Sequence, residues 1–319
     1  MSTLSDRHAI VGEIGSTHLR FALADVDELT MDHYVSFRTS DFDSIELALN
    51  AYLISLPCRP GRMSLAVAGD VAEGQAHLAH LPWIFTDKRL QDAFGVPVVN
   101  LMSDIRAVSL AVPLLAEHEL LRVAATVSPQ PGPKAVVLIE RDIETAIIVP
   151  NGRDWKVTCG RAADITFGVE DADELLVLNT IRSHPGRITV GKILTSTGLA
   201  ALHDALRLRA GLNPSGWNIS EITTAASLDE RDPFAKEAVE RFAAWLGRFA
   251  GDLAAAYGAS GGVYLVGSLP NDLRDFLTDG PFRASFARAG GPSGFASTVP
   301  VYIVKAFNVG LRGATLALS

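Results

Sequence analysis

Two stretches of the 319-residue chain share one pattern: AIVGEIGSTHLRFAL at residues 9–23 and AVVLIERDIETAIIV at residues 135–149. Each stretch is an apolar run, a short turn and a second apolar run, which is typical of a β-hairpin. Because the pattern opens the chain and then returns, it indicates an internal duplication that gives two similar domains.

Outside the hairpins, strand signals alternate with helix signals. Asp43 followed by Glu46 predicts a capping box that opens a helix, and Pro57 ends that helix. Thr86 predicts the cap of a second helix that closes at Gly95. Further strands are predicted at 63–68, 96–102, 261–267 and 299–304, and further helices at 104–111, 233–257 and 310–318. This alternation predicts an α/β fold with mixed sheets flanked by helices.

Composition narrows the class of protein. The net charge of -8 argues against a nucleic-acid or anionic-membrane partner, and no apolar stretch reaches bilayer length. Cys58 and Cys159 are too few for a disulfide framework, and the N-terminus does not read as a signal peptide, so we expect a cytoplasmic protein. His77 and His80 have no acidic or Cys partner nearby in sequence, which favours loop or core histidines and no metal site.

Six segments, in order along nearly the whole chain, resemble the bacterial glucokinase family, ATP-dependent glucose kinases of the actin-like, Hsp70-like ATPase superfamily. They are VGEIGSTHLRFALADV (11–26), LPWIF (81–85), VVNLMSDIRAVSLAVPLL (98–115), GRFAGDLAAAYGASGGVYLVG (247–267), FRASFARAG (282–290) and VPVYIV (299–304). The resemblance implies two similar actin-like ATPase (ribonuclease H-like) domains around a central cleft. We expect a small N-terminal domain at 1–125 plus 299–319 and a larger domain at 126–298, in a homodimer.

The resemblance places a first phosphate turn, D-x-G-G-T-N-x-R in the family, at residues 13–20. Gly15, Thr17 and Arg20 match the family, whereas Ser16 replaces a glycine and the leading acid is a glutamate. The stretch is either a weakened phosphate and Mg²⁺ site or an ordinary hairpin turn.

A second phosphate turn, G-x-G-T-G-x-G in the family, corresponds to residues 138–144, where every glycine is missing. Glu140, Asp142 and Glu144 stand there instead, and Arg141 offsets part of their charge. Like charges ~4 Å apart repel by about 4 kcal/mol at an intermediate dielectric, and side chains block close approach of phosphate to backbone N–H groups. The three acids either hold a divalent cation or are simply solvated.

The family's Asn-Asp pair, whose Asp takes the proton from the sugar 6-hydroxyl, corresponds to Ser103 and Asp104. A carboxylate suits this role, because phosphoryl transfer needs the nucleophile positioned. Alternatively, Asp104 only caps the helix that follows. At the adenine end, Gly267 matches a family glycine and Ser268 replaces its partner.

The family's sugar motif, G-E-G-G-H, corresponds to residues 160–164, which places Arg161 and Asp164 where the family has Glu and His. A further family Glu corresponds to Gly191. Losing these groups removes specific hexose binding. Arg161 and Asp164 either pair with each other and close the pocket, or Arg161 accepts an anionic ligand such as a sugar phosphate.

Three functions therefore remain open. The first is an ATP- and Mg²⁺-dependent hexokinase that acts on glucose through Asp104. The second is a non-catalytic regulatory or interaction protein without cofactors, since a fold survives the loss of its site. The third is a kinase of an altered, anionic sugar.

Overall fold

The computed structural model describes residues 5–124, 128–182, 186–228, 232–278, 280–289 and 294–319. The chain divides into two compact units, residues 1–115 with 306–319 and residues 116–305, and each is described by itself. Within the described ranges, no helix has the length and apolar character needed to cross a membrane.

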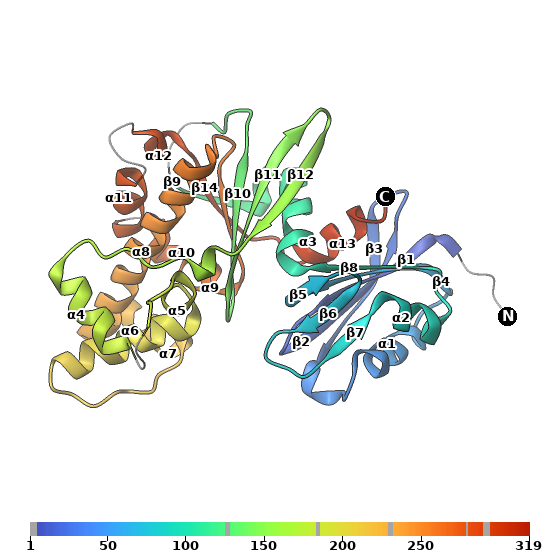
Figure 1. Cartoon of the computed structure of the whole chain (residues 1–319), viewed down its shortest axis with the longest axis horizontal. Helices are drawn as coiled ribbons and strands as arrows, with labels where there is room; N and C mark the ends of the chain where they lie inside the picture. Colours follow the sequence, from blue (N-terminus) through green and yellow to red (C-terminus); the bar gives the residue numbers. More distant parts are fainter. Residues whose placement is uncertain (1–4, 125–127, 183–185, 229–231, 279, 290–293) are drawn as a thin grey trace. The chain divides into compact units, whose positions relative to one another are not determined.

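The first unit (Figure 1) contains a five-stranded sheet, a small three-stranded sheet and flanking helices. Its strands are β1 (Ser5–Ile14), β2 (His18–Asp25), β3 (Thr30–Arg38), β4 (Pro60–Val67), β5 (Gly69–Ala72), β6 (Gln75–Leu78), β7 (Ile84–Thr86) and β8 (Val98–Ser103). Its helices are α1 (Ile45–Leu53), α2 (Asp87–Phe94), α3 (Asp104–Ala111) and α13 (Val309–Leu316), with short 3-10 turns η1 (Thr39–Asp41) and η2 (Val112–Leu114).

The main sheet of the first unit has the order β3-β2-β1-β4-β8, in which β1, β4 and β8 run parallel. Alternation along β1 sends Ile10 and Ile14 into a core that α1 and α2 cover, while Val11 packs with Leu311 of α13 on the other face. Both faces are therefore buried, as the near-continuous apolar character of β1 requires.

The second unit contains the largest core. Its strands are β9 (Leu120–Ala124), β10 (Lys134–Ile139), β11 (Ile143–Asn151), β12 (Asp154–Gly160), β13 (Val263–Val266) and β14 (Val301–Val304). Its helices are α4 (Ala172–Ile181), α5 (Val190–Ile193), α6 (Ser196–Arg209), α7 (Ile219–Ser227), α8 (Pro233–Tyr257), α9 (Ser268–Asp272), α10 (Arg274–Leu277), α11 (Pro281–Arg288) and α12 (Phe295–Thr298), with turns η3 (Glu117–Glu119) and η4 (Ala162–Asp164).

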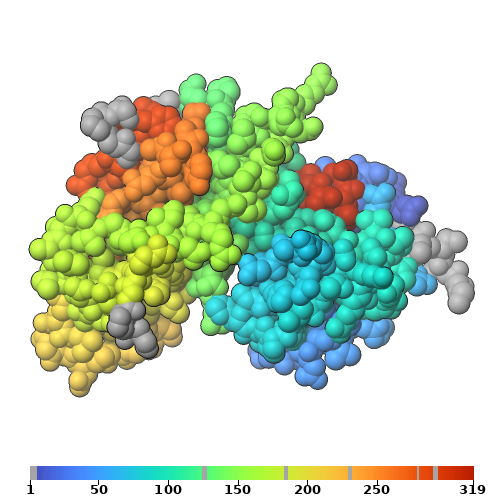
Figure 2. All heavy atoms as spheres, viewed as in Figure 1, coloured from blue at the N-terminus to red at the C-terminus, as the bar shows by residue number. Residues whose placement is uncertain are grey.

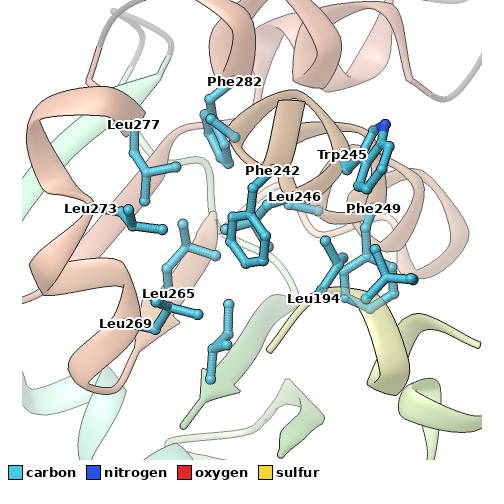
Figure 3. Packing of buried hydrophobic residues seen from close by; sticks show 14 of the residues in the cluster. Leu194, Phe242, Trp245, Leu246, Phe249, Leu265, Leu269, Leu273, Leu277 and Phe282 are labelled. Atoms are coloured by element: carbon cyan, nitrogen blue, oxygen red, sulfur yellow. The ribbon is translucent and has the colours of Figure 1, made fainter. Parts of the chain in front are cut away.

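The second sheet has the order β12-β11-β10-β13-β14-β9, so its first five strands repeat the topology of the first sheet. Helix α8 supplies Phe242 and Leu246 to its core, where they pack near Leu265 of β13 (Figure 3). The tip of the β11–β12 hairpin projects from its unit (Figure 2). The shared strand order agrees with the duplication inferred from the two hairpins.

Several expected boundaries need correction. The strand near residue 300 was expected to return to the first domain, but β14 pairs with β13 and β9 in the second sheet, so only residues 306–319 return. The expected boundary at 125 and 126 itself lies outside the described residues. The first helix is capped by Ser44, whose hydroxyl accepts the Leu47 N–H (3.4 Å), and not by Asp43.

Candidate functional site

The carboxyl ends of three parallel strands meet at one edge of the first sheet. Ile14 of β1 is paired with Val67 of β4, which is in turn paired with Ser103 of β8. The turn that starts at Gly15 and the helix that starts at Asp104 therefore leave the sheet at the same edge. Ligands of α/β sheets commonly bind at such an edge.

The turn between β1 and β2 is fixed by hydrogen bonds. The Gly15 N–H donates to the His18 carbonyl oxygen (3.0 Å). Thr39, which is 1% exposed, donates its N–H to the Thr17 carbonyl oxygen (3.0 Å) and its hydroxyl to the Gly15 carbonyl oxygen (2.8 Å). Ser16 is half-buried and Thr17 is exposed, so hydroxyl groups that can bind phosphate oxygens lie in a rigid turn.

Glu13, the lengthened acid before this turn, is paired inside the first unit. Its Oε2 lies 3.1 Å from Nη1 of Arg20, whose guanidinium lies over the Phe307 ring, 5.4 Å from the ring centroid. A Cβ on Gly310 of α13 would collide with the Glu13 carboxylate, so this glycine makes room for the acid. A metal ion that bound Glu13 would have to compete with Arg20.

Asp104 is the first residue of α3, and Ser103 is the N-cap residue. The Asp104 Oδ1 accepts the Ile105 N–H (2.7 Å), which fixes the half-buried carboxylate at the positive end of the helix dipole. If Asp104 were only a helix cap, α3 would begin at Ile105. It begins at Asp104 instead, and Ser103 is the cap. This position is compatible with a general base, because the carboxylate directly follows the end of β8, where the parallel strands of the sheet end.

The acidic turn between β10 and β11 makes a contact that the sequence did not indicate. The Glu140 carboxylate accepts the Ser268 N–H at Oε1 (2.8 Å) and the Ser268 hydroxyl at Oε2 (2.5 Å). Ser268 is the first residue of α9, and Arg141 is exposed on the turn. An anion of the chain itself therefore occupies the hydrogen-bond donors at the start of α9.

Gly267 holds a conformation that only glycine adopts easily, with φ 114°. A Cβ on Gly267 would collide with the Ile139 carbonyl oxygen at the end of β10. The close approach of these two backbones brings Glu140 and Ser268 together. The residues expected at the second phosphate turn and at the adenine end are thus neighbours in the second unit.

The stretch that corresponds to the sugar motif begins with Gly160, the last residue of β12, and ends in η4. Arg161 Nε lies 2.9 Å from Asp164 Oδ2, so these two side chains pair, as one of the two sequence interpretations expected. Their side chains remain 78% and 61% exposed, so the pair does not seal a pocket by burial. Gly191, where the family resemblance places a Glu, packs against the same stretch: an added Cβ would lie 3.1 Å from the Ala163 Cβ.

Within the part of the chain that the structure describes, no three His, Cys, Asp or Glu side chains are grouped so as to hold a metal ion. His77 Nε2 lies 2.6 Å from Nε2 of Gln75, two residues earlier on β6. In the described part of the chain, Cys58 and Cys159 are not joined in a disulfide bond.

Sequence reasoning missed two residues that organise these stretches. Thr39 lies far along the chain from Gly15, and no local pattern marks it. Arg187 donates to the Asp164 carbonyl oxygen (3.3 Å) and the Thr166 hydroxyl (3.5 Å), but it stands in a polar loop without a motif. Both depend on pairing between distant segments, which a single sequence does not reveal.

Comparison with known proteins gives consistent matches over the whole chain. A family model described as Glucokinase matches residues 10–319. The glucokinase of Caulobacter vibrioides is 30% identical over 315 residues, which cover 97% of this chain and 95% of that protein. A crystal structure of glucokinase from an Antarctic psychrotroph is 26% identical with a TM-score of 0.84, and the match covers 98% of this chain and 99% of that one.

A more distant structure resembles the chain in fold. It is a ROK-family glucokinase from Streptomyces griseus in complex with glucose and AMPPNP, with 17% identity and a TM-score of 0.67. The match covers 97% of this chain and 98% of that one.

Proposed function

Because this chain belongs to the glucokinase family, we propose that it is a sugar phosphotransferase of that family whose ATP binding is weak or lost. The family reaction transfers the γ-phosphoryl group of ATP to the 6-hydroxyl of glucose. The observation that carries the impairment is the Glu140 carboxylate bound to the Ser268 N–H and hydroxyl.

In the proposed reaction Asp104 is the general base and Ser103 contacts the sugar beside it. The hydroxyl-bearing turn at Gly15, Ser16 and Thr17 contacts the phosphates of MgATP. The rigid hydrogen bonding of that turn and the fixed carboxylate of Asp104 support these assignments. Transfer needs little covalent chemistry from the protein, so positioning by these groups supplies most of the catalysis.

In the second unit the proposal assigns nucleotide contacts to Arg141, Gly267 and Ser268. A phosphate group that approached Ser268 would meet the Glu140 carboxylate on the same donors. If the phosphate displaces the Glu140 carboxylate, the charge-assisted hydrogen bonds to Ser268 are lost. If the carboxylate stays in place, two anions lie side by side and repel each other. Either outcome weakens nucleotide binding.

A non-catalytic regulatory or interaction protein, as a cytoplasmic homodimer, is the second candidate. Two observations favour it: Glu140 binds Ser268, and Arg161 binds Asp164. In both places side chains of the chain bind each other where the family binds ligand. The folded cores remain intact in both units, so loss of activity would leave a stable surface for a partner.

A coupled assay of ADP release with MgATP and glucose tests the proposal. We expect slow turnover that Asp104→Asn lowers by about 10²- to 10⁴-fold, the usual contribution of a general base. Asp87→Asn is the matched control, because Asp87 is the first residue of α2 and also binds the next N–H, of Lys88 (2.5 Å). Turnover that both variants lower equally would reject the role of Asp104. No turnover at any MgATP concentration would leave the non-catalytic function.

A further inference from the structure

We propose that a basic cluster of the second unit, Arg161, Arg187 and Lys192, binds the anionic group of a phosphorylated or carboxylated sugar. The inference deepens the proposed function, on which it rests for the sugar part of the ligand. It names a substrate class that differs from a neutral hexose.

The three cations converge on one short stretch of chain. Arg161 pairs with Asp164 through Nε (2.9 Å). Arg187 reaches the same residue from the opposite segment, with Nη2 3.3 Å from the Asp164 carbonyl oxygen and Nη1 3.5 Å from the Thr166 hydroxyl. The Lys192 ammonium donates to the Arg187 carbonyl oxygen (3.4 Å). Each cation is thus one hydrogen bond away from another member of the cluster or from Asp164.

Backbone hydrogen bonds join the two segments that carry the cluster. The Phe167 N–H donates to the Ile188 carbonyl oxygen (2.9 Å), and the Val190 N–H donates to the Ile165 carbonyl oxygen (3.0 Å). Gly191 lets α5 approach the backbone of Ala163, whose carbonyl oxygen would lie 3.2 Å from an added Cβ. The cations are therefore presented by a fixed backbone, which reduces the entropy lost on binding.

The charge of the cluster stands out in an acidic protein. Arg161, Arg187 and Lys192 lie on two joined segments with one carboxylate partner among the described residues, that of Asp164, which pairs with Arg161, whereas the whole chain has a net charge of -8. The two hydrogen bonds that fix Arg187 go to a carbonyl oxygen and a hydroxyl, which do not neutralise its charge. Guanidinium groups bind phosphate and carboxylate through two parallel N–H bonds, so the cluster suits either anion.

The cluster includes Arg161 of the stretch that corresponds to the family's sugar motif, which suggests a sugar as its ligand. The family resemblance implies that Arg161, Asp164 and Gly191 correspond to the Glu, His and Glu that bind hexose hydroxyls in the family. A neutral hexose would find fewer acceptors there and more cations than carboxylates. A sugar that carries its own anion restores the match, and its remaining hydroxyls stay available to the rest of the site.

Calorimetric titration in the absence of nucleotide tests the cluster separately from phosphoryl transfer. The probes are glucose, glucose 1-phosphate, glucuronate and inorganic phosphate, each at low salt. We expect glucose 1-phosphate or glucuronate to bind at least ~10-fold more tightly than glucose, since one charge-assisted hydrogen bond accounts for about that factor. The stronger of the two probes identifies which anion the cluster prefers.

Variants show whether the cluster is responsible. Arg187→Gln and Arg161→Gln should each weaken binding of the anionic sugar about 10-fold. Arg187→Lys should retain only part of it, because an ammonium keeps the charge but cannot form the two parallel N–H bonds. Arg153→Gln is the matched control: Arg153 lies in the β11–β12 turn, roughly 25 Å along β12 from Arg161. Melting curves of each variant show whether the fold is kept.

Three results would overturn the inference. They are glucose binding as tightly as the anionic sugars, inorganic phosphate binding as tightly as glucose 1-phosphate, and equal losses in Arg187→Gln and Arg153→Gln. If the anionic sugar binds through the cluster but MgATP gives no turnover, the inference stands and the proposed phosphotransferase activity fails. If glucose binds and is phosphorylated while the anionic sugars do not bind, the phosphotransferase activity stands and the inference about the cluster fails.

Discussion

Glu140→Gln should strengthen binding of MgATP. The substitution removes one negative charge from the turn between β10 and β11 and keeps the length and shape of the side chain. The Ser268 N–H and hydroxyl lie 2.8 and 2.5 Å from the two carboxylate oxygens, and a glutamine can still accept one of these bonds. The variant therefore changes mainly the charge that a phosphate group would meet.

The size of the effect follows from Coulomb's law. Two unit charges 4 Å apart repel by ~1 kcal/mol in water and by ~4 kcal/mol at a dielectric of 20. Glu140 is exposed, so the lower figure applies, and ~1 kcal/mol corresponds to about fivefold in Kd. Weakening the bonds to Ser268 should cost about 1 kcal/mol of folding stability or less.

The assay is calorimetric titration of MgATP into wild type and Glu140→Gln. Asp154→Asn serves as the control for net charge, because Asp154 begins β12 beside the projecting turn, roughly 25 Å along β11 from Glu140. An unchanged Kd in Glu140→Gln, or equally tighter binding in Asp154→Asn, would show that the charge of Glu140 does not weaken MgATP binding.

Three further predictions concern stability. Thr39→Val should lower the free energy of unfolding by about 1 to 2 kcal/mol because the Gly15 carbonyl oxygen loses its buried donor, and Thr39→Ser should recover most of it in urea titrations; equal losses would contradict this. Burial holds the pKa of His203 below its ordinary 6.5, so the unfolded chain binds the proton first. Stability should then be complete above about pH 6.5 and fall as the pH decreases below it, with a smaller fall in His203→Gln; the same slope in both proteins would refute the assignment. Gly267→Ala should cost ~3 kcal/mol, through the φ of 114° and the collision with the Ile139 carbonyl oxygen, and an unchanged melting temperature would show that the backbone there adjusts.

Much of the fold follows from local sequence patterns. The periodic run at 233–257 has the bounds of α8, and Thr86 and Gly95 cap α2 as predicted. The hairpin pattern identifies β1 with β2 and β10 with β11. These elements carry their signals in consecutive residues, through caps, turns and apolar spacing.

Other elements depend on distant partners and were not predicted. The exposed strand β3 alternates weakly, and β12 is mostly exposed, so neither has an apolar signature. Strand β14 gives a clear strand signal, but nothing local says which sheet it joins. Sheet membership is decided by hydrogen bonds between segments far apart in sequence, which one sequence leaves open.

In the candidate site, too, local features could be predicted from the sequence, whereas contacts between distant segments could not. The substitutions at Glu140 and Arg161 are visible in the sequence once the family resemblance is noted. Their new partners are only partly visible in the sequence. Arg161 and Asp164 are three residues apart, a spacing at which side chains can meet. Glu140 follows β10 and Ser268 begins α9, far along the chain, and the two meet through the backbone approach at Gly267.

Calorimetric titration of the wild-type protein with MgATP at saturating glucose measures the Kd for MgATP. This Kd tests most directly how strongly the stretch from Glu140 to Glu144 can bind a polyphosphate. A turn with bulky acidic side chains in place of glycines should give a Kd above about 1 mM. A Kd near 10 μM would mean on the order of 3 kcal/mol of additional binding free energy, and it would contradict the account.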